Sequence, residues 1–500
     1  MYLCPRNYNV LHMGDIKSII DFTARTNSDI IADLKEKSVP VYDWEKSKKD
    51  YYPKEHNICH DTTNLKDKTR SDGTLEKSAR IPIGLEKLLT KRVSEFTFSI
   101  PPKRVYSNIT KEDGSIHEIR QAISKAIEAI YKNARINSEN LKRGVSYYAA
   151  CEIFTIWYAV KRENTLYGFP SKWKLKCKTY SPMKGVNLYP LFDELDDMLA
   201  MSFEYTKTVK KKSITYFETY TEDRHYIWRQ ELSGGDWEEV TMQKTEDGEI
   251  VNGEEIKLAK IPGAYLWREF PVYYDLTELR SEIEYTLSRN SNVIAYNSAP
   301  VLKISGGIKG SEDKGESRRI YRVENGGDVS YVSWQQAIEA LKYQVDTMLK
   351  LYWMQAQMPD ISFENMKSLG NIGYDARQTV LTDAHLRIGD EAGDWIEFLE
   401  RECNVIKAFL KLMKPEWASE IDNVSVEHVI TPFIQNDELA DIKKRKEANG
   451  GKPIESQLES IQRFGQSDDA SATLDQITKE EEAAVKSRAD AFSMSNQVAM

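Results

Sequence analysis

Two short stretches of the sequence carry side chains that could do chemistry. The first, His56-Asn-Ile-Cys59-His60, places three potential metal ligands within five residues. A structural zinc site needs four nitrogen or sulfur ligands that converge, and the sequence offers no second close pair of Cys or His. A metal site and an ordinary loop are both possible here, and the missing second pair favours the loop.

The second stretch is the acidic run Asp193-Glu194-Leu195-Asp196-Asp197. Such carboxylates could ligate Mg²⁺ or act as a general acid and base. No nucleophile and no phosphate-binding loop stands near them in the sequence, so a solvated turn is the favoured interpretation. The sequence also lacks a P-loop, a Rossmann G-x-G-x-x-G, a G-x-S-x-G and an H-E-x-x-H motif. We therefore expect a protein that is not an enzyme and that holds no cofactor or metal.

The composition is that of a folded protein rather than a disordered one. Of the 500 residues 40% are hydrophobic, and the formal net charge is −9. This acidic balance argues against a protein that clamps nucleic acid through a broad basic surface. The five cysteines are odd in number and scattered, which is typical of reduced thiols. No signal-peptide pattern and no apolar run near the ~20 residues that span a bilayer is visible, so we expect a soluble protein made inside the cell.

The elements that must position any site form an α+β pattern. Residues 1–75 are polar and tyrosine-rich, which indicates an extended arm or an irregular surface segment. Helices are expected at Arg80–Phe98, with Pro82 in the first turn, and at Ile116–Asn133. From Ser146 to Trp267 the sequence turns to strands and turn signals, which predicts an antiparallel meander with helices packed on it. The strands are expected at Tyr147–Val160, Met198–Lys207, Ser213–Tyr220 and His225–Leu232.

Long helices dominate the next part of the chain. Leu276–Ala299 and Gln335–Met358 each carry one apolar stripe and would be about 35 Å long. Between them lies a glycine-punctuated insertion, Lys303–Trp334, with strands expected at Arg318–Val323 and Val329–Ser333. A third long helix is expected at Ala376–Lys414, where Gly389 and Gly393 mark a candidate bend. The remaining elements are a strand at Asn423–Ile430, helices at Asn436–Ala448 and Pro453–Phe464, and a charged, partly helical tail from Lys479.

The segment QMPDISFENMKSLGNIGYDARQTVL (Gln357–Leu381) joins two long helices by a loop that is neither short nor plainly hydrophilic. Small and polar residues make its backbone pliable: these are Ser362, Asn365, Ser368, Gly370, Asn371 and Gly373. Phe363, Met366 and Leu369 interrupt them with apolar side chains.

This order of elements resembles that of the portal proteins of tailed double-stranded DNA bacteriophages, over roughly Ile81–Lys479. Three stretches carry the resemblance: FPVYYDLTELRSEIEYTLSRNSNVIAYNSAP (Phe270–Pro300), YWMQAQMPDISFENMKSLGNIGYDARQ (Tyr352–Gln378) and TPFIQNDELADIKKRKEANGGKPIESQLESIQRFGQSDDA (Thr431–Ala470). The tyrosine-rich, glycine-poor style is similar to that of crAss-like phages.

The resemblance implies a portal-type fold with an antiparallel-sheet wing, long stem helices, an inserted α/β clip, a long bent helix and a helical crown. The implied parts are an N-terminal arm (1–79), wing (80–274), first stem helix (275–300), clip (301–334), second stem helix (335–358), tunnel loop (359–375), long bent helix with a return strand to the wing (376–433), and crown with C-terminal tail (434–500).

The resemblance also implies a role and a set of partners. Copies of the chain, twelve in the family, would form a ring at the capsid vertex of the virion, through which DNA is packaged and ejected. The other partners would be the major capsid protein, the packaging ATPase (terminase), a tail adaptor and double-stranded DNA held by weak, non-specific contact, with no membrane. Assembly would take place in the host cytoplasm.

Two groups of site residues follow from the resemblance. Those expected in the tunnel loop are Asp360, Ser362, Phe363, Asn365, Met366, Lys367, Leu369, Gly370 and Asn371. Those expected to dock partners on the clip are Lys309, Arg318, Arg319, Tyr321 and Arg322. Lys367 would touch a phosphate or remain solvated, and the loop's apolar side chains would pack on the neighbouring subunit's loop or under their own helix.

Two other hypotheses stay open. The chain could be a virion adaptor protein with long helices that remains monomeric. It could instead be a metal-dependent nucleic-acid enzyme that uses the Asp193–Asp197 carboxylates.

Overall fold

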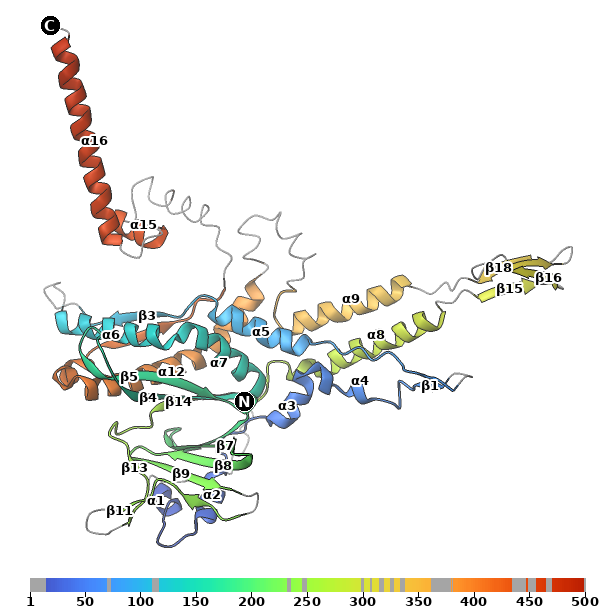
Figure 1. Cartoon of the computed structure of the whole chain (residues 1–500), viewed down its shortest axis with the longest axis horizontal. Coiled ribbons are helices and arrows are strands. Elements are labelled where there is room, and N and C mark those ends of the chain that lie inside the picture. Colours follow the sequence, from blue (N-terminus) through green and yellow to red (C-terminus); the bar gives the residue numbers. More distant parts are fainter. Residues whose placement is uncertain are drawn as a thin grey trace, which may run out of the picture. The chain divides into compact units, whose positions relative to one another are not determined.

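The computed structural model is a mixed α and β protein (Figure 1). It describes residues 15–69, 73–109, 117–231, 235–244, 250–297, 301–305, 308–313, 319–323, 328–332, 338–360, 379, 381–433, 447, 456–464 and 470–498. Within these residues every strand pairing is antiparallel, which confirms the α+β class. The chain divides into two compact units, and the first reaches Phe433.

The N-terminal segment is helical and packed, so the expectation of an extended or irregular arm is wrong for residues 15–60. Its helices are α1 (Asp15–Ile19), α2 (Asn27–Leu34), α3 (Trp44–Tyr51), the short 3₁₀ helix η1 (Pro53–Glu55) and α4 (Asn57–His60). Helix α2 begins with a capping box, in which Thr26 and Asp29 satisfy each other's backbone N–H groups. Trp44 and Tyr51 of α3 are buried in the main core. The many polar residues of this segment concealed a short apolar periodicity.

Three helices precede the first long strand: α5 (Leu85–Phe98), α6 (Glu118–Ala134) and α7 (Ile136–Ala150). Helix α5 begins five residues later than expected, and Pro82 lies outside it. Helix α7 was missed, because the aromatic residues Tyr147 and Tyr148 have high β-propensity and led to a strand prediction from Tyr147. Both rings instead pack around Trp395, with the Tyr147 and Trp395 centroids 5.1 Å apart, so tertiary packing overrides the local preference.

Two small sheets stack to form the β-rich part. The first has the order β14-β4-β5, from β4 (Glu152–Asn164), β5 (Ser171–Tyr180) and β14 (Gly263–Trp267). The second has the order β10-β9-β8-β7-β6, with β13 also paired to β9. Its strands are β6 (Val186–Phe192), β7 (Met198–Val209), β8 (Lys212–Tyr220), β9 (Arg224–Gln230), β10 (Glu238–Glu239) and β13 (Glu254–Glu255). The sheets share a core of residues such as Phe154 and Phe203. The predicted strands from Met198 onward are confirmed.

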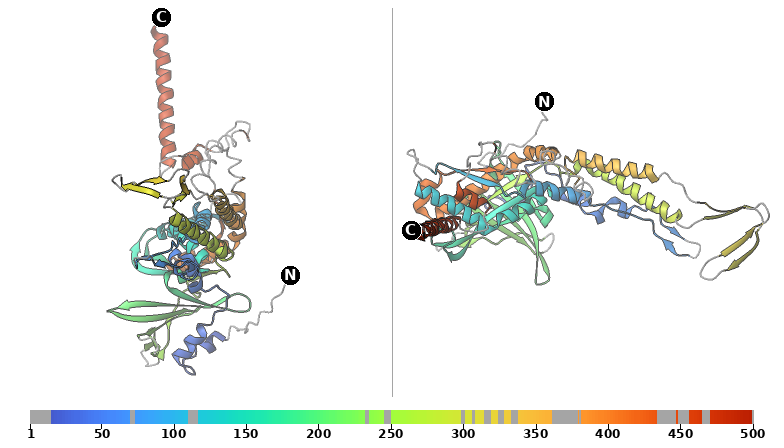
Figure 2. Two further views of the ribbon diagram at one scale, coloured as in Figure 1. Left: turned by 90° about the vertical axis from the view of Figure 1, so that its right-hand side faces the viewer. Right: turned by 90° about the horizontal axis from the view of Figure 1, so that it is seen from above.

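The long helices also lie where the sequence placed them. Helices α8 (Thr277–Asn297) and α9 (Ile338–Gln355) run side by side in Figures 1 and 2. In the sequence they are separated by two strand pairs, β15 (Val301–Ser305) with β18 (Asp328–Val332) and β16 (Ile308–Asp313) with β17 (Arg319–Val323). Two strands of the insertion were expected, and the first of each pair was missed.

Helix α12 (Thr382–Met413) is continuous and begins later than the expected Ala376. A Cβ added at Gly389 or Gly393 would meet no heavy atom within 4 Å, so packing does not require glycine there. The bend remains a prediction. Strand β19 (Ser425–Val429) then returns to pair with β3 (Lys103–Ser107), which explains its strand-like sequence.

The second unit contains α15 (Gln457–Phe464) and α16 (Ala470–Val498). The tail is therefore one long helix, where only partial helix was expected. The helix predicted at Asn436–Ala448 lies almost entirely outside the described residues. The remaining short elements of the fold are β1 (Lys68–Thr69), β2 (Leu75–Glu76), η2 (Pro182–Lys184), β11 (Gln243–Lys244), β12 (Ile250–Val251), η3 (Tyr274–Leu276), η4 (Pro415–Trp417) and α13 (Ala418–Ile421).

A buried ion pair fixes α12 on the first sheet. The Arg143 guanidinium of α7 donates to both carboxylate oxygens of Glu402, at 2.6 and 3.2 Å, and neither side chain is exposed. Trp157 Nε1 of β4 donates to the same carboxylate at 2.8 Å. Arg143 Nε donates to Thr179 Oγ1 at 3.1 Å, and Nη1, which also contacts Glu402, donates to Asn140 Oδ1 at 2.8 Å. Helix α12 is thus tied at one polar centre to α7 and β4, two consecutive elements that lie more than two hundred positions earlier in the sequence.

Loss of one partner from this centre should be costly. We expect Glu402→Ala to lower the free energy of unfolding by about 3–5 kcal/mol, because the Arg143 charge would stay buried without a counter-charge. Urea unfolding followed by tryptophan fluorescence measures this. The matched control is Asp422→Ala, which removes an exposed partner of Lys411 from the same region and should cost less than about 1 kcal/mol. Equal effects of the two substitutions would contradict the role given to this centre.

Candidate functional site: the ends of the loop between α9 and α12 and the base of α8

The segment singled out in the sequence lies mostly outside the described residues. Of the expected loop residues, the structure describes Asp360 alone; Ser362, Phe363, Asn365, Met366, Lys367, Leu369, Gly370 and Asn371 fall outside. The structure describes the residues that lead into this loop, the start of helix α12 after it, and the elements that contact both. The candidate site is built from these.

The chain that leaves α9 is fixed by two arginines. Gln357 adopts a left-handed conformation (φ +50°), and Met358 N–H donates to Trp353 O at 3.2 Å, which ends the helix in a tight turn. Arg92 Nη1 of α5 then donates to Pro359 O at 2.9 Å, and its guanidinium lies over the Trp353 ring, 4.7 Å from the centroid. Arg387 of α12 donates to Ala356 O.

Helix α5 holds a second segment beside this turn. Phe433 N–H donates to the carbonyl of Phe96 at 2.8 Å, and Phe433 O accepts from His385 Nε2 of α12 at 3.0 Å. Residues of α5 therefore fix both the chain that enters the loop and the chain that follows β19. The chain therefore enters the loop from a position that α5 and α12 fix by hydrogen bonds.

The base of α8 is held by an extended strap. Alternate backbone N–H groups of residues 79–83 donate to α8 side chains spaced four residues apart: Ala79 to Asn292 Oδ1 at 2.6 Å, Ile81 to Ser288 Oγ at 2.9 Å, and Ile83 to Glu284 Oε1 at 2.6 Å. Two extended residues advance about 6.6 Å and four helical residues advance 6.0 Å, so the two periods match. The strap explains why α5 begins late, because its predicted first turn is used to bind α8.

Arg280 neutralises the charge of Glu284, the carboxylate that binds the last N–H group of this strap. Its guanidinium donates to Glu86 of α5 at 2.8 Å, to Glu284 at 2.9 Å and to Asp50 of α3 at 2.8 Å, and its side chain is 4% exposed. Hydrogen bonding to charged groups of this kind is strong where water is excluded. Arg280 thus joins α3, α5 and α8 at one point.

His56 is also part of this network, and its side chain is fully buried. Its Nδ1 lies 2.6 Å from Glu284 Oε1 and its Nε2 lies 2.8 Å from Asp50 O, and both partners are acceptors. Both ring nitrogens of His56 are therefore engaged within the protein. Cys59 donates to Pro53 O. Among the described residues no three His, Cys, Asp or Glu side chains are grouped as metal ligands would be.

The pKa values of the two glutamates move in opposite directions. Burial raises the pKa of Glu86 to about 7, against the opposing effect of Arg280. One oxygen of that carboxyl, Oε2, is buried without a hydrogen-bond partner, which gives the raised value a structural cause. Burial acts on Glu284 in the same sense, but hydrogen bonds from His56, Ile83 N–H and Arg280 outweigh it and hold its pKa below the ordinary value.

The acidic run at residues 193–197 forms a turn. Asp193 Oδ1 accepts from the backbone N–H groups of Leu195 and Asp197, both at 2.8 Å, and Asp193 N–H donates to Asp197 O. A side chain that closes its own turn is the ordinary use of Asp in loops. The arrangement supports the turn interpretation over an acid–base pair.

Of the five residues expected to dock partners on the clip, four lie on strands and one lies outside the described residues. Lys309 is on β16, Arg319, Tyr321 and Arg322 are on β17, and Arg318 lies outside the described residues. Their grouping as a partner-docking site stays a prediction.

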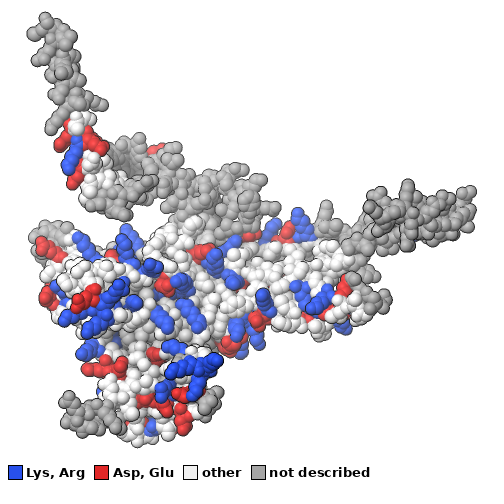
Figure 3. Space-filling view, viewed as in Figure 1, with Lys and Arg blue, Asp and Glu red and all other residues white. Residues whose placement is uncertain are grey.

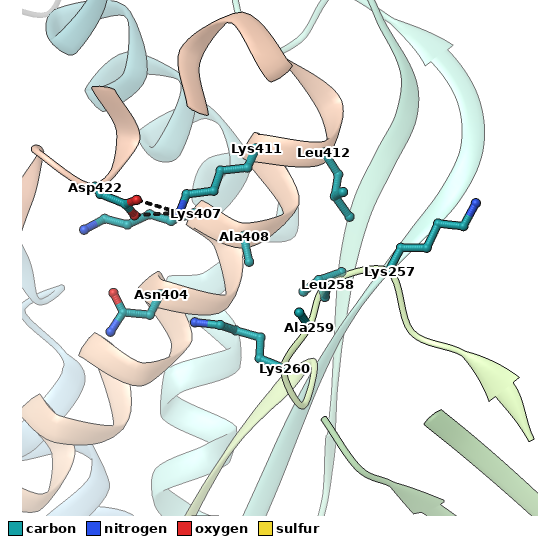
Figure 4. Close-up of a pocket in the computed structure, with 10 residues that line it drawn as sticks. All are labelled: Lys257, Leu258, Ala259, Lys260, Asn404, Lys407, Ala408, Lys411, Leu412 and Asp422. Atoms are coloured by element: carbon teal, nitrogen blue, oxygen red, sulfur yellow. Dashed lines mark hydrogen bonds and ion pairs between the residues drawn. The ribbon is translucent and has the colours of Figure 1, made fainter. Parts of the chain in front are cut away.

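A pocket of about 500 Å³ lies between α12 and residues 257–260, and four lysines line it (Figure 4). Two of the amines are engaged by the protein: Lys407 donates to Val424 O at 2.7 Å and Lys411 to Asp422 at 2.7 Å. Lys257 points away from the other lining residues in Figure 4. The donors do not converge on one point, so the pocket is not a built anion site.

Sequence reasoning missed Arg92, Arg280 and Arg387. The side chains at positions 280, 284, 288 and 292 do form a polar stripe beside the predicted apolar stripe of α8, and a second stripe of this kind is the signal that could have revealed the strap. Nothing in the sequence pairs Arg92 with Pro359 or Arg387 with Ala356. Of the helices in the described ranges, none is long and apolar enough to cross a bilayer.

A family described as "Phage portal protein, SPP1 Gp6-like" matches residues 43–487 of the 500. No curated protein matches the chain.

The Arg92 anchor predicts a local change in stability. Arg92→Met keeps aliphatic contact with Trp353 but removes the donor to Pro359 O, so cleavage by chymotrypsin at Phe363 should become at least about tenfold faster. Lys91→Met is the matched control, because Lys91 lies next to it on α5 with an exposed side chain. Timed proteolysis read by mass spectrometry measures the rates. Equal rates for the two variants would show that Arg92 does not hold the loop.

The raised pKa of Glu86 predicts a pH-dependent difference in stability. A carboxyl whose folded pKa lies above its unfolded value stabilises the fold below the unfolded pKa, and this contribution is lost as pH rises through the folded pKa. Between the ordinary 4.5 and about 7 the loss is roughly 3 kcal/mol at most. Glu86→Gln mimics the protonated form and should gain stability over the unchanged protein between pH 5 and pH 8. Urea unfolding at both pH values tests this, and a difference that is independent of pH would contradict it.

Proposed function

The chain belongs to the phage portal protein family, and we propose that its copies close into a ring around a channel through which DNA enters and leaves the capsid. The protein is a component of the virion at the capsid vertex, where portal proteins connect head and tail. The family match over residues 43–487 carries this conclusion. The family is structural, so we infer that the chain acts as a conduit and not as an enzyme.

Exposed apolar residues on the helix pair support contact between copies. Tyr343, Leu351 and Met354 of α9 lie near one face of the helix and are 74%, 39% and 63% exposed. Ile294 of α8 is 53% exposed. Such a row of large side chains is costly in water and is expected at an interface. A head-to-tail contact that closes on itself would cover it in every copy.

The parts of the chain are assigned by analogy with the family. In this proposal α8 and α9 are the stem helices, and the two-stranded pairs between them belong to the clip. The other boundaries remain as expected from the sequence: wing 80–274, tunnel loop 359–375, long helix with return strand 376–433, and crown with tail 434–500. Residues 15–60 pack in the same unit as the wing, and we include them with it.

We infer that the loop at residues 359–375 faces the channel. Its start is held by Arg92 and Arg387, so a pliable segment would hang from a fixed support. Lys367 is the one cation in the sequence of this segment, and Asp360 is an anion. A wall with so few cations releases few counterions on contact with DNA and would therefore bind a passing duplex weakly.

The clip is proposed as the docking surface for the terminase during packaging and for the tail adaptor afterwards. Its candidate residues are Lys309, Arg318, Arg319, Tyr321 and Arg322. The wing would contact the major capsid protein. Twelve copies per ring and assembly in the host cytoplasm are the family's expectations for this chain.

Ring formation gives the direct test. Purified protein is expected to show the mass of a closed oligomer by mass photometry and a ring with a central opening by negative-stain imaging. The double variant Tyr343→Glu/Met354→Glu should remain folded but shift to monomers, because charge at the exposed row opposes its burial. Gln344→Glu, at an exposed polar position of α9, is the control and should still assemble. A folded, unchanged protein that stays monomeric at micromolar concentration would favour the monomeric adaptor.

A further inference from the structure

Strand β5 carries a row of lysines on one side. Lys172, Lys174, Lys176 and Lys178 occupy alternate positions, while Leu175 between them is buried against α6. Because strand side chains alternate and advance about 6.6 Å per two residues, the four amines follow one another along a single side. Strand β5 is an edge strand of its sheet, so this row borders open surface.

The β7–β8 hairpin adds four more lysines. Lys207 is exposed near the end of β7, and the pairing of Val209 with Lys212 leaves Lys210 and Lys211 as a two-residue turn. Both turn residues are left-handed, with φ of +50° and +66°. Such turns strongly favour Asn-Gly, and a lysine in this conformation costs roughly 1 kcal/mol or more. The sequence thus places two positive charges where the backbone would be more stable without them.

Aromatic rings join the two groups of lysines. Lys178 Nζ lies 4.5 Å from the Tyr180 ring centroid, and Tyr180 stacks on Phe203 of β7 at 4.5 Å. Lys207 Nζ lies 4.7 Å from the Tyr205 ring centroid on the same strand. We call the eight lysines together the basic face: Lys172, Lys174, Lys176, Lys178, Lys207, Lys210, Lys211 and Lys212. Figure 3 shows Lys and Arg side chains gathered in groups over the β-rich part on the visible side.

The basic face has few counter-charges, and one of them is Glu218 of β8, which interacts electrostatically with Lys207. Within the described residues Lys212 alone forms an ion pair, with exposed Glu231 at 3.8 Å. Elsewhere on the molecule exposed lysines do find carboxylates, as Lys48 does with Glu45. In a chain of net charge −9, eight lysines of which seven form no ion pair are a marked concentration of positive potential.

We propose that the basic face binds the phosphate backbone of double-stranded DNA without regard to sequence. Lysine is a point charge suited to phosphate, and the face lacks the Arg forks and Asn or Gln pairs that read base edges. A specific acidic protein partner would be expected to meet bidentate arginines, and none of the eight residues of the basic face is an arginine. The surface is built from β5, β7 and β8, whereas the start of the loop is held by α5 and α12, so this inference goes beyond the channel function.

Salt-dependent binding tests the proposal on the full-length protein. The probes are two fluorescein-labelled 30-base-pair duplexes of unrelated sequence, followed by anisotropy between 50 and 300 mM NaCl. Each phosphate contact contributes about 0.9 to the slope of log K against log salt. Replacing Lys172, Lys174, Lys176 and Lys178 by Gln should lower the magnitude of that slope by at least about 2 and weaken binding at least tenfold at 100 mM salt, equally for both duplexes.

A second variant separates binding from stability. Lys210→Asn with Lys211→Gly gives the turn its preferred residues, so the melting temperature should rise while the salt slope falls by up to about 1.8. The control variant is Lys125→Gln with Lys132→Gln, two exposed positions of α6 on the other side of β5. It removes the same charge and should leave both slope and melting temperature unchanged.

Three results would overturn the proposal. The first is loss of DNA binding by the control to the same degree as by the basic-face variants. The second is binding of poly-glutamate but not of either duplex, which would identify an acidic protein partner. The third is aggregation of the β5 variant without any loss of DNA binding, which would mean that the lysines merely protect an edge strand. Mass photometry of each variant reports ring assembly separately, and Lys367→Gln reports the loop, so failure here is distinguishable from failure of the portal proposal.

Discussion

The polar stripe of α8 is the feature on which the arrangement of the helix pair depends. A helix that projects from a domain usually docks through an apolar stripe, and α8 has one that includes Leu279, Ile283 and Leu287. The direction of α8 is fixed by polar groups. Three of its side chains accept hydrogen bonds from alternate N–H groups of residues 79–83. Arg280 of the same helix is neutralised by carboxylates from three elements. Hydrophobic contact is non-directional, whereas hydrogen bonds with matched spacing fix both register and angle. The strap therefore fixes the direction of α8, which apolar packing alone would not determine.

The same logic explains the support of the loop. Arg92 and Arg387 each direct a guanidinium at a backbone carbonyl just after α9, where the chain leaves the helix and its carbonyls lose their internal partners. Phe96 and Phe433 join the neighbouring segment to the same helix α5. The buried pair of Arg143 and Glu402 extends that support through α12 to the first sheet.

The sequence predicted what periodicity can report and missed what depends on distant partners. The stripes of α8, α9 and α12 were read correctly, because one helix face determines them. Tyr147 and Tyr148 were read as strand, since their preference for α7 arises from Trp395, more than two hundred positions away. The N-terminal helices were hidden by charged residues that surround a few buried ones, such as Trp44. Of the candidate site, the family resemblance singled out the segment between α9 and α12 as a tunnel loop, which stays a prediction. No local pattern pairs Arg92 with Pro359 or Glu86 with Arg280.

The central claim is that the loop at residues 359–375 lines a channel and that α5 and α12 hold the chain where it enters this loop. A cryo-electron microscopy reconstruction of the purified assembly tests it most directly. The account predicts a closed ring in which this segment projects toward the axis at the narrowest point of the opening, with α9 and α12 radiating outward from it. A map that places the segment on the outer circumference, or an assembly with no axial opening, would contradict it.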